Sequence, residues 1–165
     1  LDMLWRKTGA LYQFSGMAGA MIGLNVADPD HPLVKAIADF TSGCGTAFQL
    51  QDDILGLVGD EATLGKPIGS DIREGKRTVI LCHAFQKATS DEKKLMMEVV
   101  GNAAAPDDKV ARVKDLMLSL GGVDHARGLA EARSAAAMSN LDAVPASPYK
   151  NYLINWAEYL IGRSF

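Results

Sequence analysis

With 165 residues, of which 48% are hydrophobic and 22% charged, the chain can bury the core of one globular domain without disulfides or a structural metal. Its net charge of −3 gives no overall attraction to nucleic acid or anionic membrane, and no apolar stretch reaches the about 20 residues that span a bilayer, so neither partnership is predicted. Cys44 and Cys82 are too few for a disulfide framework and lack zinc-like spacing, so we expect two buried thiols in a cytoplasmic protein.

Helical patterns cover the amino-terminal third of the chain. Apolar residues recur at helical spacing over residues 3–26, and the segment Asp-Pro-Asp-His-Pro at 28–32 supplies a turn and a helix start. A second long helix is predicted from Leu33 to Val58. Glycines such as Gly43 and Gly45 in its middle let a neighbouring backbone or a ligand approach closely.

The segment from Gly59 to Lys76 is rich in glycine and charge and is predicted to be a long loop. Helices then resume, with Ser90 as the expected cap of the second. Their expected ranges are Thr78–Lys87, Ser90–Val100, Asp107–Leu120, Val123–Leu141 and Pro148–Gly162. Because there is no strand pattern and no internal repeat, the predicted fold class is all-α, an antiparallel helical bundle.

One face of the second helix carries polar groups. Gln49, Asp52, Asp53 and Gly56 fall at i, i+3, i+4 and i+7, which aligns an amide and two carboxylates beside a gap. Such a pair of acids is usually a solvated surface feature. Here apolar neighbours surround it and lysines follow it, which favours a hard cation such as Mg²⁺ that takes oxygen ligands.

The following loop, GDEATLGKPIGSDIREGKRT, offers groups that bind phosphate. It is not the nucleotide-binding P-loop, because five residues separate Gly59 from Gly65 and Pro67 stands where Ser or Thr should hold the metal. Its glycines allow backbone amides to approach anionic oxygens, and Lys66 and Lys76 supply point charges. A solvated loop whose lysines pair with nearby acids is the plainer alternative.

These residues resemble the trans-isoprenyl diphosphate synthases, the family that includes farnesyl and geranylgeranyl diphosphate synthases. FQLQDDILGLVGDEATLGKPIGSDIREGKRT is similar to their second aspartate-rich region, and LWRKTGALYQFS to their earlier Lys-Thr segment. The resemblance extends to about Phe85. It implies the all-α isoprenoid synthase fold and transfer of an allylic prenyl group to isopentenyl diphosphate, with Mg²⁺ as cofactor.

The resemblance also implies the ligands of the metal. Asp52 would ligate Mg²⁺ that bridges the allylic diphosphate, with Asp53 beside it. Asp71 would act through a metal-bound water.

The resemblance further implies the groups that contact the substrate. Lys66 and Lys76 would bind the allylic diphosphate, and Lys7 would do so from the earlier helix. The Thr8 hydroxyl and the Gln49 amide would lie near the allylic carbon, where cationic charge develops. Lys7, Thr8 and Gln49 are therefore the predicted catalytic residues.

The chain departs from the family pattern in two ways. Gly56 stands where the second motif commonly has its third Asp, which leaves Asp60 as the next acid. The first aspartate-rich motif and the basic residues that hold isopentenyl diphosphate lie upstream of the Lys-Thr segment in the family and are missing here. We therefore expect residues 1–165 to be a single all-α domain, the carboxyl-terminal half of a truncated synthase, inactive alone and homodimeric when intact.

Two alternatives to a synthase remain. A non-catalytic regulatory subunit of a heteromeric synthase would share the same motifs. A terpene cyclase would share diphosphate ionisation, although the spacing of GKPIGSDIREGKRT resembles synthases more than cyclases.

Overall fold

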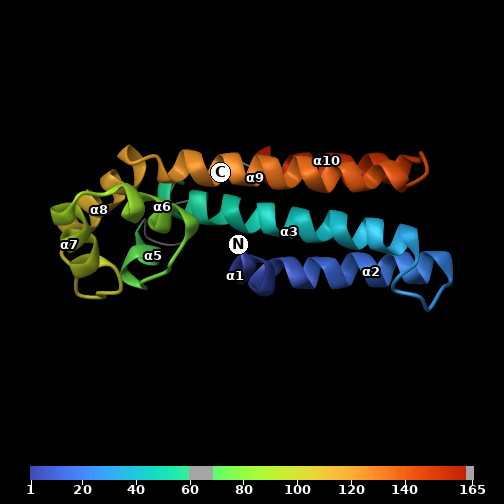
Figure 1. Cartoon of the computed structure of the whole chain (residues 1–165), viewed down its shortest axis with the longest axis horizontal. Helices are drawn as coiled ribbons and strands as arrows, with labels where there is room; N and C mark the ends of the chain where they lie inside the picture. The colour runs from blue at the N-terminus through green and yellow to red at the C-terminus, as the bar shows by residue number, and fades with distance from the viewer. Residues whose placement is uncertain (60–68, 163–165) are drawn as a thin grey trace. The chain divides into compact units, whose positions relative to one another are not determined.

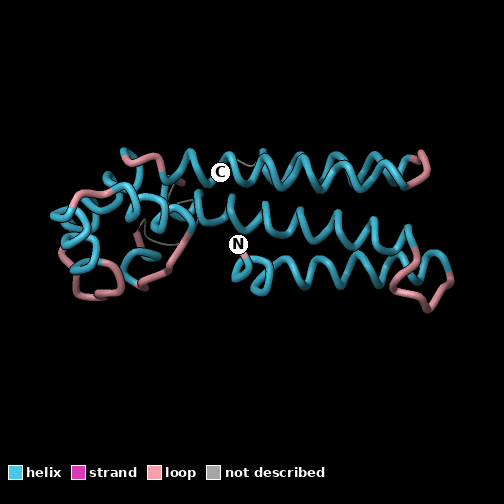
Figure 2. The backbone as a smooth tube through the Cα atoms, viewed as in Figure 1, coloured by secondary structure: helices cyan, strands magenta, loops and turns pink. Residues whose placement is uncertain are grey.

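A computed structural model of the chain describes residues 1–59 and 69–162, and every regular element in those residues is helical (Figure 1, Figure 2). The predicted all-α class is therefore confirmed. In chain order the elements are α1 (Asp2–Leu4), the π-helix η1 (Trp5–Gly9), α2 (Ala10–Leu24), α3 (Pro32–Val58), α5 (Ser70–Arg73), α6 (Val79–Lys87), α7 (Ser90–Val99), α8 (Asp107–Ser119), α9 (Gly122–Ser139), the 3₁₀ helix η2 (Asn140–Ala143) and α10 (Pro148–Gly162). In these described ranges, no helix combines the length and apolar composition that crossing a bilayer requires.

The residues group into two compact units. The first combines Leu1–Gln51 with Leu129–Arg163, and the second is formed by Asp52–Gly128. The division falls inside α3 and inside α9. The expectation of a single domain over residues 1–165 stays a prediction.

The core of the first unit joins α2, α3, α9 and α10 around aromatic rings. Phe40 and Cys44 on α3 are fully buried with Leu141 and Leu160. The Trp156 ring on α10 stacks on Tyr12 of α2 at 5.8 Å and meets the Phe40 ring edge-on at 6.0 Å. Each such side chain stabilises the unit by about 1.5–3 kcal/mol when fully buried.

The predicted close approach at the glycines of α3 is confirmed. A methyl group at Gly45 would lie 2.8 Å from the Tyr12 ring, and one at Gly43 would lie 2.7 Å from Ala137. These distances are shorter than a carbon contact allows, so α2 and α9 pack where α3 has no side chain.

The core of the second unit gathers the end of α3, α6, α7, α8 and the start of α9. Its most buried members are small or branched: Ala84 of α6, Val99 of α7, Val113 of α8 and Ala126 of α9 are wholly inaccessible. Because these side chains are short, the helices around them can pack tightly. This core includes Ile72 of α5.

Three local predictions were wrong. The predicted loop contains the helix α5, whose four residues are too few for a periodic pattern. Thr89, not Ser90, caps α7, because only Thr89 has a Glu three residues later to close a capping box at Glu92. Cys82 is exposed on α6, so only Cys44 is a buried thiol.

Candidate functional site

The Lys-Thr segment lies in a π-helical turn of the first unit. Lys7 and Thr8 belong to η1, and π-turns are rare and often found at functional sites. Trp5 donates a hydrogen bond from Nε1 to Ser42 Oγ at 3.0 Å, which attaches this turn to α3. Gly9 packs so closely that an added Cβ would lie 2.8 Å from the Trp5 ring. The apolar spacing of residues 3–26 predicted a helix here but not its π-turn.

Two predicted catalytic groups are in direct contact in this unit. Thr8 donates a hydrogen bond from Oγ1 to Gln49 Oε1 at 2.7 Å. Gln49 is buried, with 4% of its surface exposed, whereas Lys7 is exposed. The hydroxyl therefore fixes the amide orientation, and a pair of neutral dipoles is held on the part of α3 that belongs to the first unit.

The second unit contains an ion-pair cluster of three predicted site residues. Lys76 Nζ lies 2.9 Å from Asp53 Oδ1 and 2.8 Å from Asp71 Oδ2. The exposed fractions of the three side chains are 23% for Lys76, 2% for Asp53 and 14% for Asp71. One ammonium thus bridges two carboxylates that are largely removed from water.

The fold of residues 69–78 brings Lys76 back to Asp71. The short helix α5 is followed by Gly75 at φ +72°, a left-handed conformation that glycine adopts without strain. The backbone N–H of Lys76 then donates a hydrogen bond to the backbone carbonyl of Asp71 at 3.0 Å. This bond holds the two residues close together, and their side chains meet in the ion pair. An added Cβ at Gly75 would lie 2.9 Å from Gly101 Cα, which also favours glycine there.

Gly56 lies against the cluster. A Cβ built at Gly56 would lie 3.2 Å from Asp71 Oδ2, closer than ordinary van der Waals contact. Gly56 stands where the resembled motif has its third acid, so the side chain of such an acid would begin beside the Asp71 carboxylate. No sequence pattern showed this proximity, because fifteen positions separate the two residues.

Electrostatics keep Lys76 charged. Burial alone would lower the pKa of Lys76, but the hydrogen bonds and negative charges of Asp71 and Asp53 outweigh it and raise that pKa above its ordinary value. Lys76 is therefore an ammonium at every physiological pH.

The donor set suits a hard cation. Asp53 and Asp71 already converge on one positive group, and Mg²⁺ often takes only one or two protein carboxylates and completes its shell with water and phosphate oxygens. Asp52 is the half-buried neighbour of Asp53 on α3. Among the described residues no group of three or more His, Cys, Asp or Glu side chains is arranged to hold a metal. Lys66 lies outside the described residues, as does Asp60.

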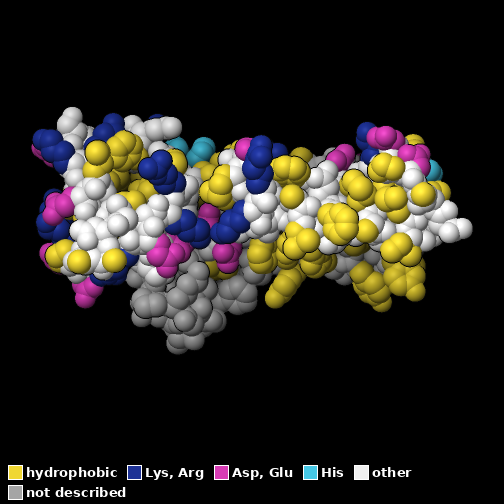
Figure 3. Space-filling view, turned by 90° about the horizontal axis from the view of Figure 1, so that it is seen from below, with side chains coloured by type: hydrophobic (Ala, Val, Ile, Leu, Met, Phe, Trp, Pro, Cys, Tyr) yellow, Lys and Arg dark blue, Asp and Glu magenta, His cyan; other side chains and the backbone are white. Residues whose placement is uncertain are grey.

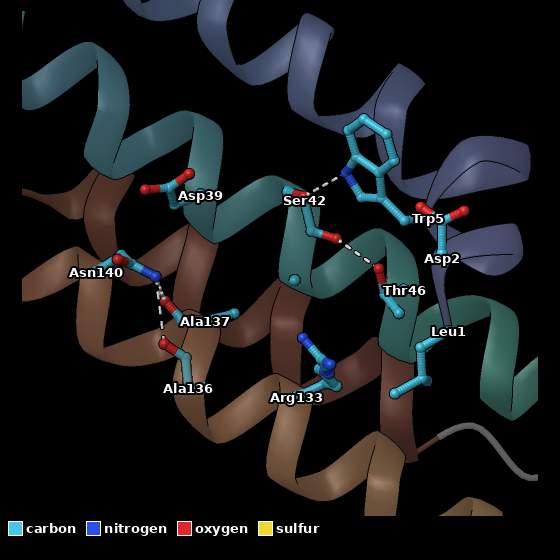
Figure 4. Close-up of a pocket in the computed structure, with 11 residues that line it drawn as sticks. Leu1, Asp2, Trp5, Asp39, Ser42, Thr46, Arg133, Ala136, Ala137 and Asn140 are labelled. Carbon is cyan, nitrogen blue, oxygen red and sulfur yellow. Dashed lines mark hydrogen bonds between the residues drawn. The ribbon is translucent and has the colours of Figure 1, made fainter. Parts of the chain in front are cut away.

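A separate hollow of about 360 Å³ lies in the first unit (Figure 4). Trp5 and Asp2 from the start of the chain, Ser42 and Asp39 from α3, and Arg133 from α9 are among its lining residues. None of the predicted site residues lines it. Its mixed charges show no arrangement specific to diphosphate.

One cluster in the second unit had no signal in the sequence. His83 of α6 and His125 of α9 stack with their ring centroids 4.1 Å apart and an interplanar angle of 19°. Stacked rings direct their nitrogen lone pairs in parallel planes, so this pair is a poor chelate for a metal. It is a packing contact between α6 and α9.

The polyprenyl synthetase family model matches residues 1–117 of the chain. The geranylgeranyl diphosphate synthase of Sulfolobus acidocaldarius is 40% identical over 145 residues, which are 87% of this chain and 42% of that protein. The short chain isoprenyl diphosphate synthase of Methanocaldococcus jannaschii is 40% identical over 117 residues, 71% of this chain and 35% of that protein.

Solved structures agree with these matches. The geranylgeranyl pyrophosphate synthetase from Pyrococcus horikoshii matches with a TM-score of 0.86 and 33% identity, over 99% of this chain and 48% of that one. The polyprenyl synthase from Caulobacter crescentus, complexed with calcium and isoprenyl diphosphate, matches with a TM-score of 0.89 and 29% identity, over 99% of this chain and 49% of that one. The chain thus spans less than half the length of these relatives.

Proposed function

The chain belongs to the polyprenyl synthetase family, whose model matches residues 1–117, and on that premise we propose that it supplies the diphosphate-binding part of a prenyl diphosphate synthase. The proposed reaction transfers an allylic prenyl group from its diphosphate to isopentenyl diphosphate and lengthens the chain. Names of relatives such as geranylgeranyl and short chain isoprenyl diphosphate synthase support this class without fixing the product length.

The Asp53–Lys76–Asp71 cluster is the observation that carries the proposal. The Lys76 ammonium lies within 2.9 Å of an oxygen of each of two carboxylates, in a largely buried position. This composition suits a site that must hold both a divalent cation and the phosphate oxygens bound to it.

Departure of diphosphate leaves positive charge on the allylic carbon, so the leaving group must be stabilised. Bound Mg²⁺ would neutralise negative charge on the diphosphate oxygens as they leave. Asp52, Asp53 and Asp71 would hold the ion. Lys76, together with Lys66 of the loop, would donate hydrogen bonds to the diphosphate.

Residues of the first unit have a complementary proposed role. Lys7 would add a third ammonium on the diphosphate. The Thr8–Gln49 pair presents neutral dipoles rather than charges, which suits a position beside an electron-poor carbon. The double bond of isopentenyl diphosphate would then attack that carbon, and loss of a proton would complete the transfer.

An apolar surface on α2 supports the predicted homodimer as part of the proposal. Leu11, Phe14 and Ile22 share one face of that helix and are 68%, 66% and 80% exposed. Figure 3 shows hydrophobic side chains gathered over this region. Contiguous exposed apolar surface commonly marks an interface with further polypeptide. We propose that this face is covered in the active assembly, and that the 165-residue chain alone is inactive.

A chimaera tests the proposed function. Residues 1–165 would replace the matching part of the Sulfolobus acidocaldarius synthase, and incorporation of labelled isopentenyl diphosphate would be measured. We expect transfer that falls about 100- to 1,000-fold in Asp53→Asn and in Lys76→Met, the range for removing one preorganised stabilising group. Lys94→Met is the matched control, because Lys94 pairs with Asp91 on the exposed face of α7.

Other outcomes of this assay are informative. A folded, active chimaera that is insensitive to both substitutions would contradict the assignment of the site. A folded chimaera that binds allylic diphosphate but transfers nothing would instead favour the non-catalytic regulatory subunit. Consumption of allylic diphosphate without isopentenyl diphosphate would indicate a cyclase.

A further inference from the structure

Lys76 occupies one oxygen of each of two carboxylates that are proposed to hold the metal. Its Nζ is in hydrogen-bond contact with Asp53 Oδ1 and Asp71 Oδ2, the two acids brought together in the second unit. Mg²⁺ binds carboxylate oxygens at about 2.0–2.1 Å, so an ion on the same oxygens would lie only a few Å from that ammonium. Two cations at that separation in a poorly hydrated position repel strongly.

The hollow beside the cluster is too small for both cations. The hollow that Asp53, Asp71 and Lys76 line has a volume of about 10 Å³, roughly what one water molecule requires. Its remaining walls include the apolar side chains of Leu57 and Met117. A hydrated divalent ion is larger than this hollow, so it would enter there only if Lys76 moved.

Among the described residues at the cluster, Lys76 is the cation that can move away from the carboxylates. Its side chain is 23% exposed and ends in a flexible stem, so a path toward solvent exists. The neighbouring Arg73 is not a competitor, because its guanidinium contacts Asp107 and the Ala105 carbonyl instead.

We infer that Lys76 is the resident counterion of the metal site: it holds Asp53 and Asp71 in the metal-free protein, is displaced by the divalent cation, and then turns to the diphosphate. The last step rests on the proposed function, whereas the first two do not. Because one side chain leaves the carboxylates and joins the diphosphate, each ligand favours the conformation that the other requires. Metal and diphosphate are thereby coupled through Lys76.

The two possible roles of Lys76 predict opposite changes in metal affinity when Lys76 is replaced. A lysine that only supports the site would weaken metal binding when removed. A competing lysine would weaken diphosphate binding but strengthen binding of the metal alone. The sign of the change in metal affinity therefore separates the two roles.

The test is a titration of Mn²⁺ into the 165-residue chain, followed by electron paramagnetic resonance without and with inorganic pyrophosphate. We expect Lys76→Met to bind Mn²⁺ alone at least fivefold more tightly than the unmodified chain. Pyrophosphate should then enhance its Mn²⁺ affinity less than it enhances that of the unmodified chain. Lys94→Met should match the unmodified chain, and the double variant Lys76→Met/Asp53→Asn should lose the gain.

A second measurement uses the unmodified chain and does not depend on the folding of a variant. Acylation of lysines by an activated ester would be quantified by mass spectrometry, with the exposed Lys94 as internal reference. Mg²⁺ alone should raise the modification of Lys76 at least twofold, and adding pyrophosphate should lower it again.

The outcomes distinguish this inference from the proposed function. Unchanged or weaker Mn²⁺ binding in folded Lys76→Met, or no effect of Mg²⁺ on Lys76 acylation, overturns the counterion role. Tighter Mn²⁺ binding with pyrophosphate affinity unaffected by the substitution supports the counterion role and contradicts the diphosphate contact.

Discussion

Asp53 and Lys76 show how one ion pair connects stability with function. The Asp53 side chain is 2% exposed, so its charge has lost most of its hydration and depends on protein partners. The motif predicted that acids at this position would need positive groups. It could not show which lysine pairs with Asp53 before any ligand arrives, because that depends on Gly75 and on the turn after α5.

Replacing Lys76 tests this dependence. Removing one member of a buried ion pair costs about 3–5 kcal/mol, and because 23% of the Lys76 side chain is exposed we expect about 2–4 kcal/mol for Lys76→Met. Urea denaturation of the metal-free chain measures the change. Lys94→Met, which breaks an exposed pair, should cost less than about 1 kcal/mol. Equal losses in the two variants would show that the cluster contributes nothing special.

At the scale of elements, the long helices were predictable and the short features were not. Apolar periodicity and the proline at position 32 located α3 to within one residue. The π-turn η1, the helix α5 and the cap of α7 escaped detection. Periodicity requires several turns, whereas these features depend on one side chain or one close contact, as at Gly9 and Thr89.

The cap of α7 gives a direct comparison of two adjacent residues. Thr89 Oγ1 accepts a hydrogen bond from Glu92 N, and the Glu92 carboxylate accepts one from Thr89 N at 2.7 Å. We expect Thr89→Ala to lower the free energy of unfolding by about 1 kcal/mol. Ser90→Ala should change it by less than half as much. The reverse order, measured by urea denaturation, would restore Ser90 as the cap.

The stacked His83 and His125 rings, which join α6 to α9, lead us to expect that the stability of the fold depends on pH. Desolvation, followed by the nearby His125 and Lys87, lowers the pKa of His83 below its ordinary value near 6.5. The unfolded chain then binds more protons than the folded chain as pH falls below about 6.5, so stability should decrease there.

Urea midpoints from pH 8 to pH 5 measure this effect. His83→Gln should lessen the decrease on the acid side, whereas His31→Gln, a change at the turn before α3, should leave it unaltered. Parallel profiles for the unmodified chain and His83→Gln would contradict the account of the stacked pair.

At the scale of the whole molecule, the resemblance of two motifs to a known family indicated more about function than the spacing of apolar and charged residues did. The fold class followed from periodicity, but membership of the polyprenyl synthetase family followed from the motifs at Lys7–Thr8 and Gln49–Thr78 and agrees with the family match. The chain spans less than half the length of these relatives. Gly56 shows what the motif alone could not explain. A side chain at Gly56 would contact the Asp71 carboxylate. Asp71 therefore lies beside the space that the third acid of the motif would occupy.

The most direct test of the central claim is a calorimetric titration of inorganic pyrophosphate into the 165-residue chain in the presence of Mg²⁺. We predict binding that depends on Mg²⁺ and weakens at least about tenfold in Asp53→Asn, since a charge-assisted contact contributes about 1.5–3 kcal/mol. Equal binding by the unmodified chain and a folded Asp53→Asn variant, or binding that is independent of Mg²⁺, would contradict it.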